Sequence, residues 1–486
     1  MRNSIILFAI CNLLLLWGCQ TRPGTTADPE RLPNIIYILA DDLGYGDLGC
    51  YGQEHFATPH IDCLAEGGIR FTRHYAGSTV CAPSRSVLMT GFHTGHTPVR
   101  GNREVQPEGQ YPLPAASFTL AEMLHEQGYV TGAFGKWGLG YPGSEGDPVR
   151  QGFDQFFGYN CQRYAHRYYP AYLWENSQKY ALEGNDWTRT VTYAPDVIQA
   201  RTLDFIRTHR DHPFFAYVPV TIPHAELTAP EDSIYRQMLG RFPEEPYQGG
   251  PGADYGPDMV IGRYCSQAAP HATFAAMVVR LDRYVGEIIA TLEELDLDEH
   301  TLVFFSSDNG PHQEGGADPD FFSSSGGLRG IKRDLYEGGI RVPLIAYWPG
   351  TIKPGRVSDH FSAFWDLFPT LADLTGFPLD STDGISFLPE LLEMEQPEHD
   401  LLYWEFHEQG GKQALLTGEW KAVRLGVGAD PRAPLELYHL KSDPAESTNV
   451  AGEHPELAER ISRMMEEERT PSPVFNFGRP GEGDRE

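Results

Sequence analysis

Chemically reactive side chains follow four apolar segments that have the composition of buried β-strands. These side chains are Asp41 and Asp42 after residues 34–40, Lys136 after 130–134, His224 after 214–218, and Asp308 with Asn309 after 302–305. Because ligands bind at the carboxyl ends of strands in open parallel sheets, we expect these residues to surround one site. A helix cap or a turn explains one such strand end, but it does not explain four together.

Three of these side chains are carboxylates and one is an amide. Asp41, Asp42, Asp308 and Asn309 supply the oxygen ligands that Ca²⁺ and Mg²⁺ prefer, without the histidine or cysteine pairing typical of zinc. Without a cation, three carboxylates at one edge of a sheet would repel each other. The sequence therefore predicts a divalent cation here, and the spacing leaves both calcium and magnesium open.

Cys81 begins a predicted short helix. Pro83 suits the first turn of that helix, and Gly91 is a typical residue for its end. The N-terminus of a helix favours anions, because its backbone N–H groups are unpaired and carry partial positive charge. Arg85 lies one turn beyond Cys81 on the same face. Taken alone, Cys81 would be interpreted as a buried structural cysteine.

The segment around this cysteine resembles the signature of the formylglycine-dependent type I sulfatases. It reads Cys81-x-Pro83-Ser84-Arg85 and is followed by Thr90-Gly91. In that family the cysteine is oxidised after translation to formylglycine, whose hydrate attacks the sulfate ester. The similarity extends over about residues 33–451 and includes the segments 34–44, 58–62, 135–140, 307–310, 328–332, 336–343 and 437–446. It implies an alkaline-phosphatase-like α/β fold with a mostly parallel sheet between helices and a small C-terminal sheet domain.

The resemblance also implies a role for each matching residue. One Ca²⁺ would be held by Asp41, Asp42, Asp308 and Asn309, with Cys81 as formylglycine being the nucleophile, Arg85 stabilising its hydrate, Lys136 and Lys332 binding sulfate oxygens, and His224 protonating the leaving alcohol. The implied substrate is a sulfated carbohydrate, with galactose-type 4-O-sulfates as the first expectation. The implied partner is the maturation enzyme that generates formylglycine.

One position departs from the family's pattern. The family has a histidine after Lys-Trp, where it is expected to bridge the sulfate and the nucleophile, and this chain has Gly138. We predict that His166 fills that role from the loop that begins at Asn160, and that Arg163 of the same loop contacts the substrate. The alternative is a purely structural aromatic loop. Three further side chains either contact sugar hydroxyls or face solvent: Glu226, Glu405 and His407.

The elements that must position these residues alternate between strand and helix. This alternation predicts an α/β fold whose mainly parallel sheet has helices on both faces. After residue 378 the pattern changes to short strands and one charged helix, which predicts a small α+β domain with a short antiparallel sheet. The predicted organisation is a catalytic domain at 33–378, a connecting segment at 379–400, the small domain at 401–469 and a flexible tail at 470–486.

The N-terminus has the pattern of a targeting segment. Residues 1–18 predict a signal peptide, and Leu16-Trp17-Gly18-Cys19 resembles a bacterial lipobox, so Cys19 is the expected lipidation site. Residues 19–32 would then form a polar tether, and the protein would be exported to the periplasm or the bacterial outer-membrane surface, meeting the membrane only through its lipid anchor. An ordinary signal peptide is the alternative.

The net charge of the chain argues against one class of function, nucleic-acid binding. The chain carries 67 acidic and 38 basic residues, a net charge of −29, so its general field repels nucleic acid. Two other functions remain open: a phosphate or phosphonate monoester hydrolase on the same fold, and an inactive surface lipoprotein that binds sulfated glycans. The motif at Cys81 favours sulfate over phosphate, and the presence of both Cys81 and His224 argues against an inactive protein.

Overall fold

The computed structural model describes residues 32–477. The predicted signal peptide and the predicted lipidation site at Cys19 lie outside these residues. In the described part of the chain, no helix combines the length and the apolar character that crossing a membrane requires.

The centre of the molecule is an 11-stranded sheet with the order β12-β2-β11-β10-β1-β9-β5-β6-β7-β8, in which β13 also pairs with β2. The strands β10, β1, β9, β5 and β6 are mutually parallel, whereas β11 and β7 run against their neighbours. The prediction of a mostly parallel sheet is therefore confirmed. The bounds are β1 Asn34–Asp41, β2 Ile69–Tyr75, β5 Val130–Lys136, β6 Gln155–Tyr159, β7 Tyr172–Glu175, β8 Gln178–Ala181, β9 Phe214–Pro223, β10 Thr301–Ser307, β11 Arg341–Tyr347, β12 Arg356–Ser358 and β13 Ser362–Ala363.

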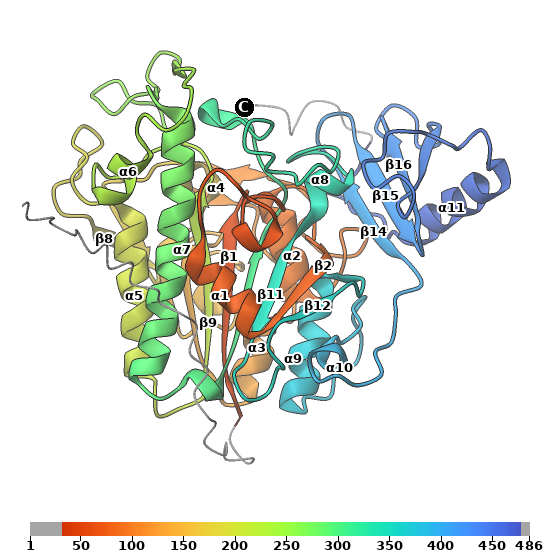
Figure 1. Ribbon diagram of the computed structural model, residues 1–486, viewed down its shortest axis with the longest axis horizontal. Helices are drawn as coiled ribbons and strands as arrows, with labels where there is room; N and C mark the ends of the chain where they lie inside the picture. The colour runs from red at the N-terminus through yellow and green to blue at the C-terminus, as the bar shows by residue number, and fades with distance from the viewer. Residues whose placement is uncertain (1–31, 478–486) are drawn as a thin grey trace, which may run out of the picture.

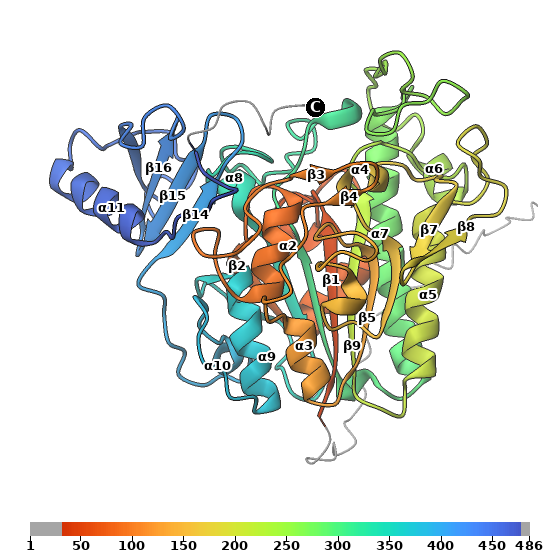
Figure 2. The same cartoon turned by 180° about the vertical axis from the view of Figure 1, so that it is seen from behind.

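Helices cover both faces of this sheet (Figures 1 and 2). One face carries α1 (Pro59–Gly67), α5 (Ala194–Thr208) and α7 (Pro270–Glu294), and the other carries α2 (Cys81–Thr90), α3 (Leu120–Glu126) and α9 (Leu367–Thr375). Successive side chains of β1 enter two different cores: Tyr37 packs on the α2 side and Ile38 on the α7 side. This two-sided burial explains why β1 has a continuous apolar sequence instead of an alternating one.

Shorter elements complete the catalytic region. They are α4 (Gln162–Ala165), α6 (Ser233–Met238), α8 (Glu337–Ile340), α10 (Leu388–Leu391), and the small hairpin of β3 (Glu104–Val105) and β4 (Gly109–Gln110).

The C-terminal part forms a second, four-stranded antiparallel sheet that lies beside α8 (Figure 1). Its strands are β14 (Leu402–Phe406), β15 (Lys412–Thr417), β16 (Trp420–Leu425) and β17 (Leu435–His439), and α11 (Pro455–Glu467) packs against it. The predicted short antiparallel sheet is confirmed.

The first residues of the predicted flexible tail are packed against the rest of the protein. Arg100 donates hydrogen bonds to the backbone and side-chain oxygens of Thr470, and Phe475 is buried with its ring 5.5 Å from that of Tyr111. The Pro-, Gly- and charge-rich composition does not reveal that Phe475 supplies an apolar anchor.

Candidate active site

Four neighbouring strands of the large sheet bring the predicted residues to one edge. Asp41 is the last residue of β1 and Lys136 is the last residue of β5, while His224 follows β9 and Asp308 follows β10. Because β10, β1, β9 and β5 are adjacent and parallel, their carboxyl ends lie together. All four side chains are buried.

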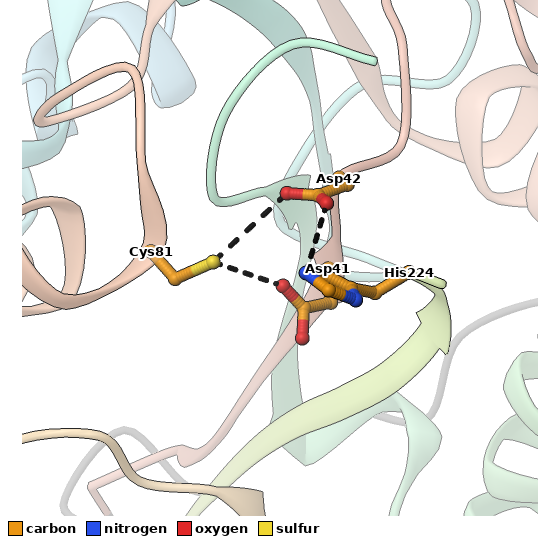
Figure 3. A group of neighbouring side chains, drawn as sticks. All are labelled: Asp41, Asp42, Cys81 and His224. Carbon is orange, nitrogen blue, oxygen red and sulfur yellow. Dashed lines mark hydrogen bonds and ion pairs between the residues drawn. The ribbon is translucent and has the colours of Figure 1, made fainter. Parts of the chain in front are cut away.

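Cys81 begins α2 and its sulfur points at the two aspartates, as Figure 3 shows. Its Sγ lies 3.3 Å from Asp41 Oδ1, 3.9 Å from Asp42 Oδ1 and 3.3 Å from Lys136 Nζ. Burial, together with Asp308 and Asp41, raises the pKa of the Cys81 thiol well above its ordinary value. Because the thiolate is the nucleophilic form of cysteine, these surroundings disfavour an unmodified thiol as the nucleophile.

The oxygen ligands predicted for a cation form one connected group. Asn309 Nδ2 donates to Asp42 Oδ1 at 2.7 Å, and the backbone N–H of Asp42 donates to Asp308 Oδ1 at 3.1 Å. Asn309 Oδ1 is buried and has no hydrogen-bond partner among residues 32–477. An unpaired amide oxygen beside three buried carboxylates is the donor set that a hard divalent cation takes, so the residues fit such an ion.

Three buried cationic side chains neutralise these carboxylates. Arg85 Nη2 lies 2.8 Å from Asp308 Oδ2, Lys136 Nζ lies 2.7 Å from Asp41 Oδ2, and Lys332 Nζ lies 2.7 Å from Asp42 Oδ2. Although burial opposes the charged form, the nearby Asp42 and Glu314 raise the pKa of Lys332 well above its ordinary value. Three carboxylates and three cations balance each other, so a bound divalent cation would give the site the net positive charge that an anionic substrate requires.

His224 lies beside Asp42 and Lys332. Its Nε2 is 3.0 Å from Lys332 Nζ and 3.2 Å from Asp42 Oδ2, and its Nδ1 contacts the backbone oxygen of Ala225. The position of Nε2 places it within reach of a group bound by Lys332. Burial, followed by Lys332 and Lys136, lowers the pKa of His224 well below its ordinary value.

Two other histidines stack on His224. The ring of His166 lies 4.6 Å from it and the ring of His312 lies 5.6 Å from it. The structure thus places the predicted His166 at the His224 side of the site. Sequence reasoning missed His312 and its ion-pair partner Glu314. The distance between His312 Nδ1 and Glu314 Oε2 is 3.2 Å. Their position directly after the Asp308-Asn309 motif is the signal that could have found them.

The other predicted sugar contacts lie elsewhere. Glu226 and Glu405 are fully buried in ion pairs, Glu226 with Arg167 at 2.6 Å and Glu405 with Arg100 at 2.7 Å. Both carboxylates therefore have arginine partners within the protein.

The remaining two candidates also have protein partners. His407 lies 3.2 Å from Glu405 and stacks on Phe477 at 4.3 Å. Arg163 is partly exposed and donates to Gln106 Oε1 and to the backbone oxygen of Pro107. Arg163 therefore fixes the turn that joins β3 to β4.

A cavity of about 190 Å³ lies beside Lys332. It is lined by Gln313, Glu314, Ile331, Lys332, Arg333, Asp334 and Gln409. Gln409 belongs to the C-terminal sheet region, so both parts of the protein border this cavity. Its polar lining suits a hydrophilic substrate.

A buried cysteine at a helix N-terminus, a carboxylate group for a cation and three fixed cations define a hydrolase of anionic esters with an alkaline-phosphatase-like fold. Comparison with known families agrees: the model for the Sulfatase family matches residues 33–377, and that for the N-sulphoglucosamine sulphohydrolase C-terminal region matches residues 331–470. The chain belongs to the sulfatase family and is a sulfuric ester hydrolase.

Individual relatives support this membership. The chain is 33% identical to human arylsulfatase A, over 90% of this chain and 87% of that protein. It is 29% identical to N-acetylgalactosamine-6-O-sulfatase of Bacteroides thetaiotaomicron, over 97% of this chain and 100% of that protein. Among solved structures, Ps i-CgsB in complex with k-i-k-neocarrahexaose superposes with a TM-score of 0.73 at 26% identity, covering 90% of this chain and 92% of that one.

Proposed function

We propose that this sulfatase hydrolyses sulfate monoesters of carbohydrates, with galactose-type 4-O-sulfates as its first candidate substrates. The observation that carries the proposal is the contact of Cys81 with Asp41, Asp42 and Lys136 in a buried site that also holds Lys332 and His224. A carbohydrate substrate is supported by the oligosaccharide named in the complex of Ps i-CgsB and by the amino sugar in the name of the Bacteroides relative.

The residues divide the chemistry between them. Formylglycine at position 81 would supply, as its hydrate, one hydroxyl to attack sulfur and a second to expel the sulfate. Lys136 and Lys332 hold the sulfate oxygens, since Lys136 Nζ contacts the Cys81 sulfur and Lys332 Nζ contacts Asp42, the carboxylate beside that sulfur. Arg85 holds Asp308 in place. Lys332 Nζ and His224 Nε2 hold a proton between them close to the leaving alcohol oxygen. An alcohol is a poor leaving group unless its oxygen receives a proton.

A panel of defined sulfated sugars tests the substrate. It contains galactose and N-acetylgalactosamine, each sulfated at position 4 or 6, with an aryl sulfate and an aryl phosphate for comparison. Sulfate release is expected to be fastest from galactose 4-sulfate and much slower from the aryl phosphate. Faster release from a 6-sulfate would refute the assigned position, and turnover of the aryl sulfate alone would refute the carbohydrate class.

Calcium is the proposed cation, held by Asp41, Asp42, Asp308 and Asn309. An ion that binds only the folded state stabilises it by about 2.7 kcal/mol at a hundredfold excess over the dissociation constant. Exhaustive chelation is therefore expected to lower the melting temperature and the aryl sulfatase activity together, and added Ca²⁺ should restore both. Full restoration by Mg²⁺ but not by Ca²⁺ would assign the site to magnesium, and no response to chelation would exclude a structural cation.

A further inference from the structure

The space beside Gly138 is filled by the side chain of another residue. A β-carbon on Gly138 would lie 2.1 Å from Nε2 of Gln162, so any side chain at position 138 would overlap that amide. Gly138 also has a φ of +78°, in the region that favours glycine. Its N–H donates to the backbone oxygen of Asn160 at 3.0 Å, which fixes the segment carrying Gln162 against the end of β5. Gln162 therefore takes the position that a longer side chain at 138 would occupy.

The side-chain amide of Gln162 has no hydrogen-bond partner among the residues that the structure describes. Its Nε2 and Oε1 are both buried without a hydrogen bond in the described chain, and the same holds for both side-chain polar atoms of Asn160. The two residues are 5% and 1% exposed. A buried amide without partners costs free energy, and most native amides avoid this by bonding to protein, water or ligand. The unpaired Gln162 and Asn160, here called the amide pair, thus have the property of groups that bind a ligand.

The amide pair follows the strand that lies beside β5, and β5 ends in Lys136. Asn160 directly follows β6, whose last residue Tyr159 is in register with Lys136 on β5. The ammonium of Lys136 is 3.3 Å from the Cys81 sulfur. Farther along the same segment, His166 stacks on His224 at 4.6 Å and its Nδ1 is also buried without a partner. The segment 160–166 thus runs from the strand paired with β5 to the ring of His224.

We propose that Gln162 donates a hydrogen bond from its amide to an oxygen of the bound sulfate group, in the role predicted from the sequence for His166. The proposal rests on the sulfatase function proposed above. Sulfate oxygens accept hydrogen bonds, and the amide is neutral at every pH, so this donor keeps its proton where an imidazole would titrate.

Binding of inorganic sulfate tests the proposal without requiring turnover. In the Cys81→Ala background, calorimetry is expected to show that Gln162→Leu weakens sulfate binding by about 10-fold to 100-fold, the effect of losing one hydrogen bond to a charged group. Gln162→Glu should weaken it further by placing an anion beside the sulfate. Gln155→Leu is the matched control, because Gln155 is an exposed glutamine at the start of the same strand β6, and it should change nothing.

The variants also separate the possible outcomes. Thermal melting confirms that each variant folds, and His166→Ala is measured in parallel. Sulfate affinity of Gln162→Leu within twofold of its parent would overturn the proposal, and a selective loss in His166→Ala would return the role to His166. If Gln162→Leu loses sulfate affinity while the parent enzyme cleaves no sulfated sugar, the role of Gln162 stands and only the proposed carbohydrate substrate fails.

Discussion

Cys81→Ala is expected to abolish sulfate release while leaving the fold intact. Loss of a covalent nucleophile typically lowers turnover by a factor on the order of 10⁴ or more. The groups that contact the Cys81 sulfur belong to Asp41, Asp42 and Lys136. None of these three side chains has a hydroxyl or a thiol that could act as the nucleophile in its place. The substitution removes a single sulfur atom from α2, which should change the melting temperature little. Release of 4-nitrophenol from its sulfate ester and thermal melting measure the two effects.

Cys50→Ala provides the control for this experiment. Cys50 is also a free cysteine, but it lies in the short helical turn Gly49–Tyr51, where its backbone N–H bonds to Asp62. The activity of the Cys50→Ala protein should stay near that of the parent enzyme. Retention of more than a tenth of the activity by Cys81→Ala would show that another residue attacks the ester.

Lys421→Met is expected to destabilise the protein strongly. Lys421 lies on β16 of the C-terminal sheet, and its ammonium is 2.8 Å from Glu337 of α8 and 3.4 Å from Glu446. All three side chains are fully buried. Removing the lysine leaves Glu446 without its cation and leaves Glu337 with only Arg341, whose Nη1 is 3.4 Å away. Breaking a buried ion pair by removing one partner typically costs about 3–5 kcal/mol. Because Glu337 follows Lys332 by only five residues, activity should fall together with stability.

Urea unfolding followed by fluorescence measures this effect. Lys441→Met is the matched control, because Lys441 is exposed and follows the same C-terminal sheet. Its unfolding midpoint should remain that of the parent. A Lys421→Met protein that unfolds at the same urea concentration as the parent would mean that the buried charges contribute no net stability.

The central part of the fold and most of the site could be predicted because they depend on local patterns. Apolar runs that end in Asp41, Lys136, Pro223 and Ser307 identify strands buried on both faces, and parallel pairing then brings their ends together. The reversed direction of β11 could not be predicted in this way. An apolar run of that length carries no information on strand direction, which depends on the connections before and after it.

Residue contacts across the fold explain the remaining differences. Glu226 and Glu405 were expected either to contact sugar or to face solvent, and a sequence does not show that both are buried in ion pairs with Arg167 and Arg100. Gln162 is separated from Gly138 by a loop and by β6, so only the folded chain reveals that its amide fills the space at Gly138.

The central claim is that the reacting group of this sulfatase is made from Cys81. Mass spectrometry of the peptide containing residue 81, isolated from protein preparations of different specific activity, tests this claim most directly. The fraction of the peptide that carries formylglycine is expected to rise in proportion to specific activity and to approach zero in inactive preparations. Fully active protein whose residue 81 is an unmodified cysteine would contradict the account.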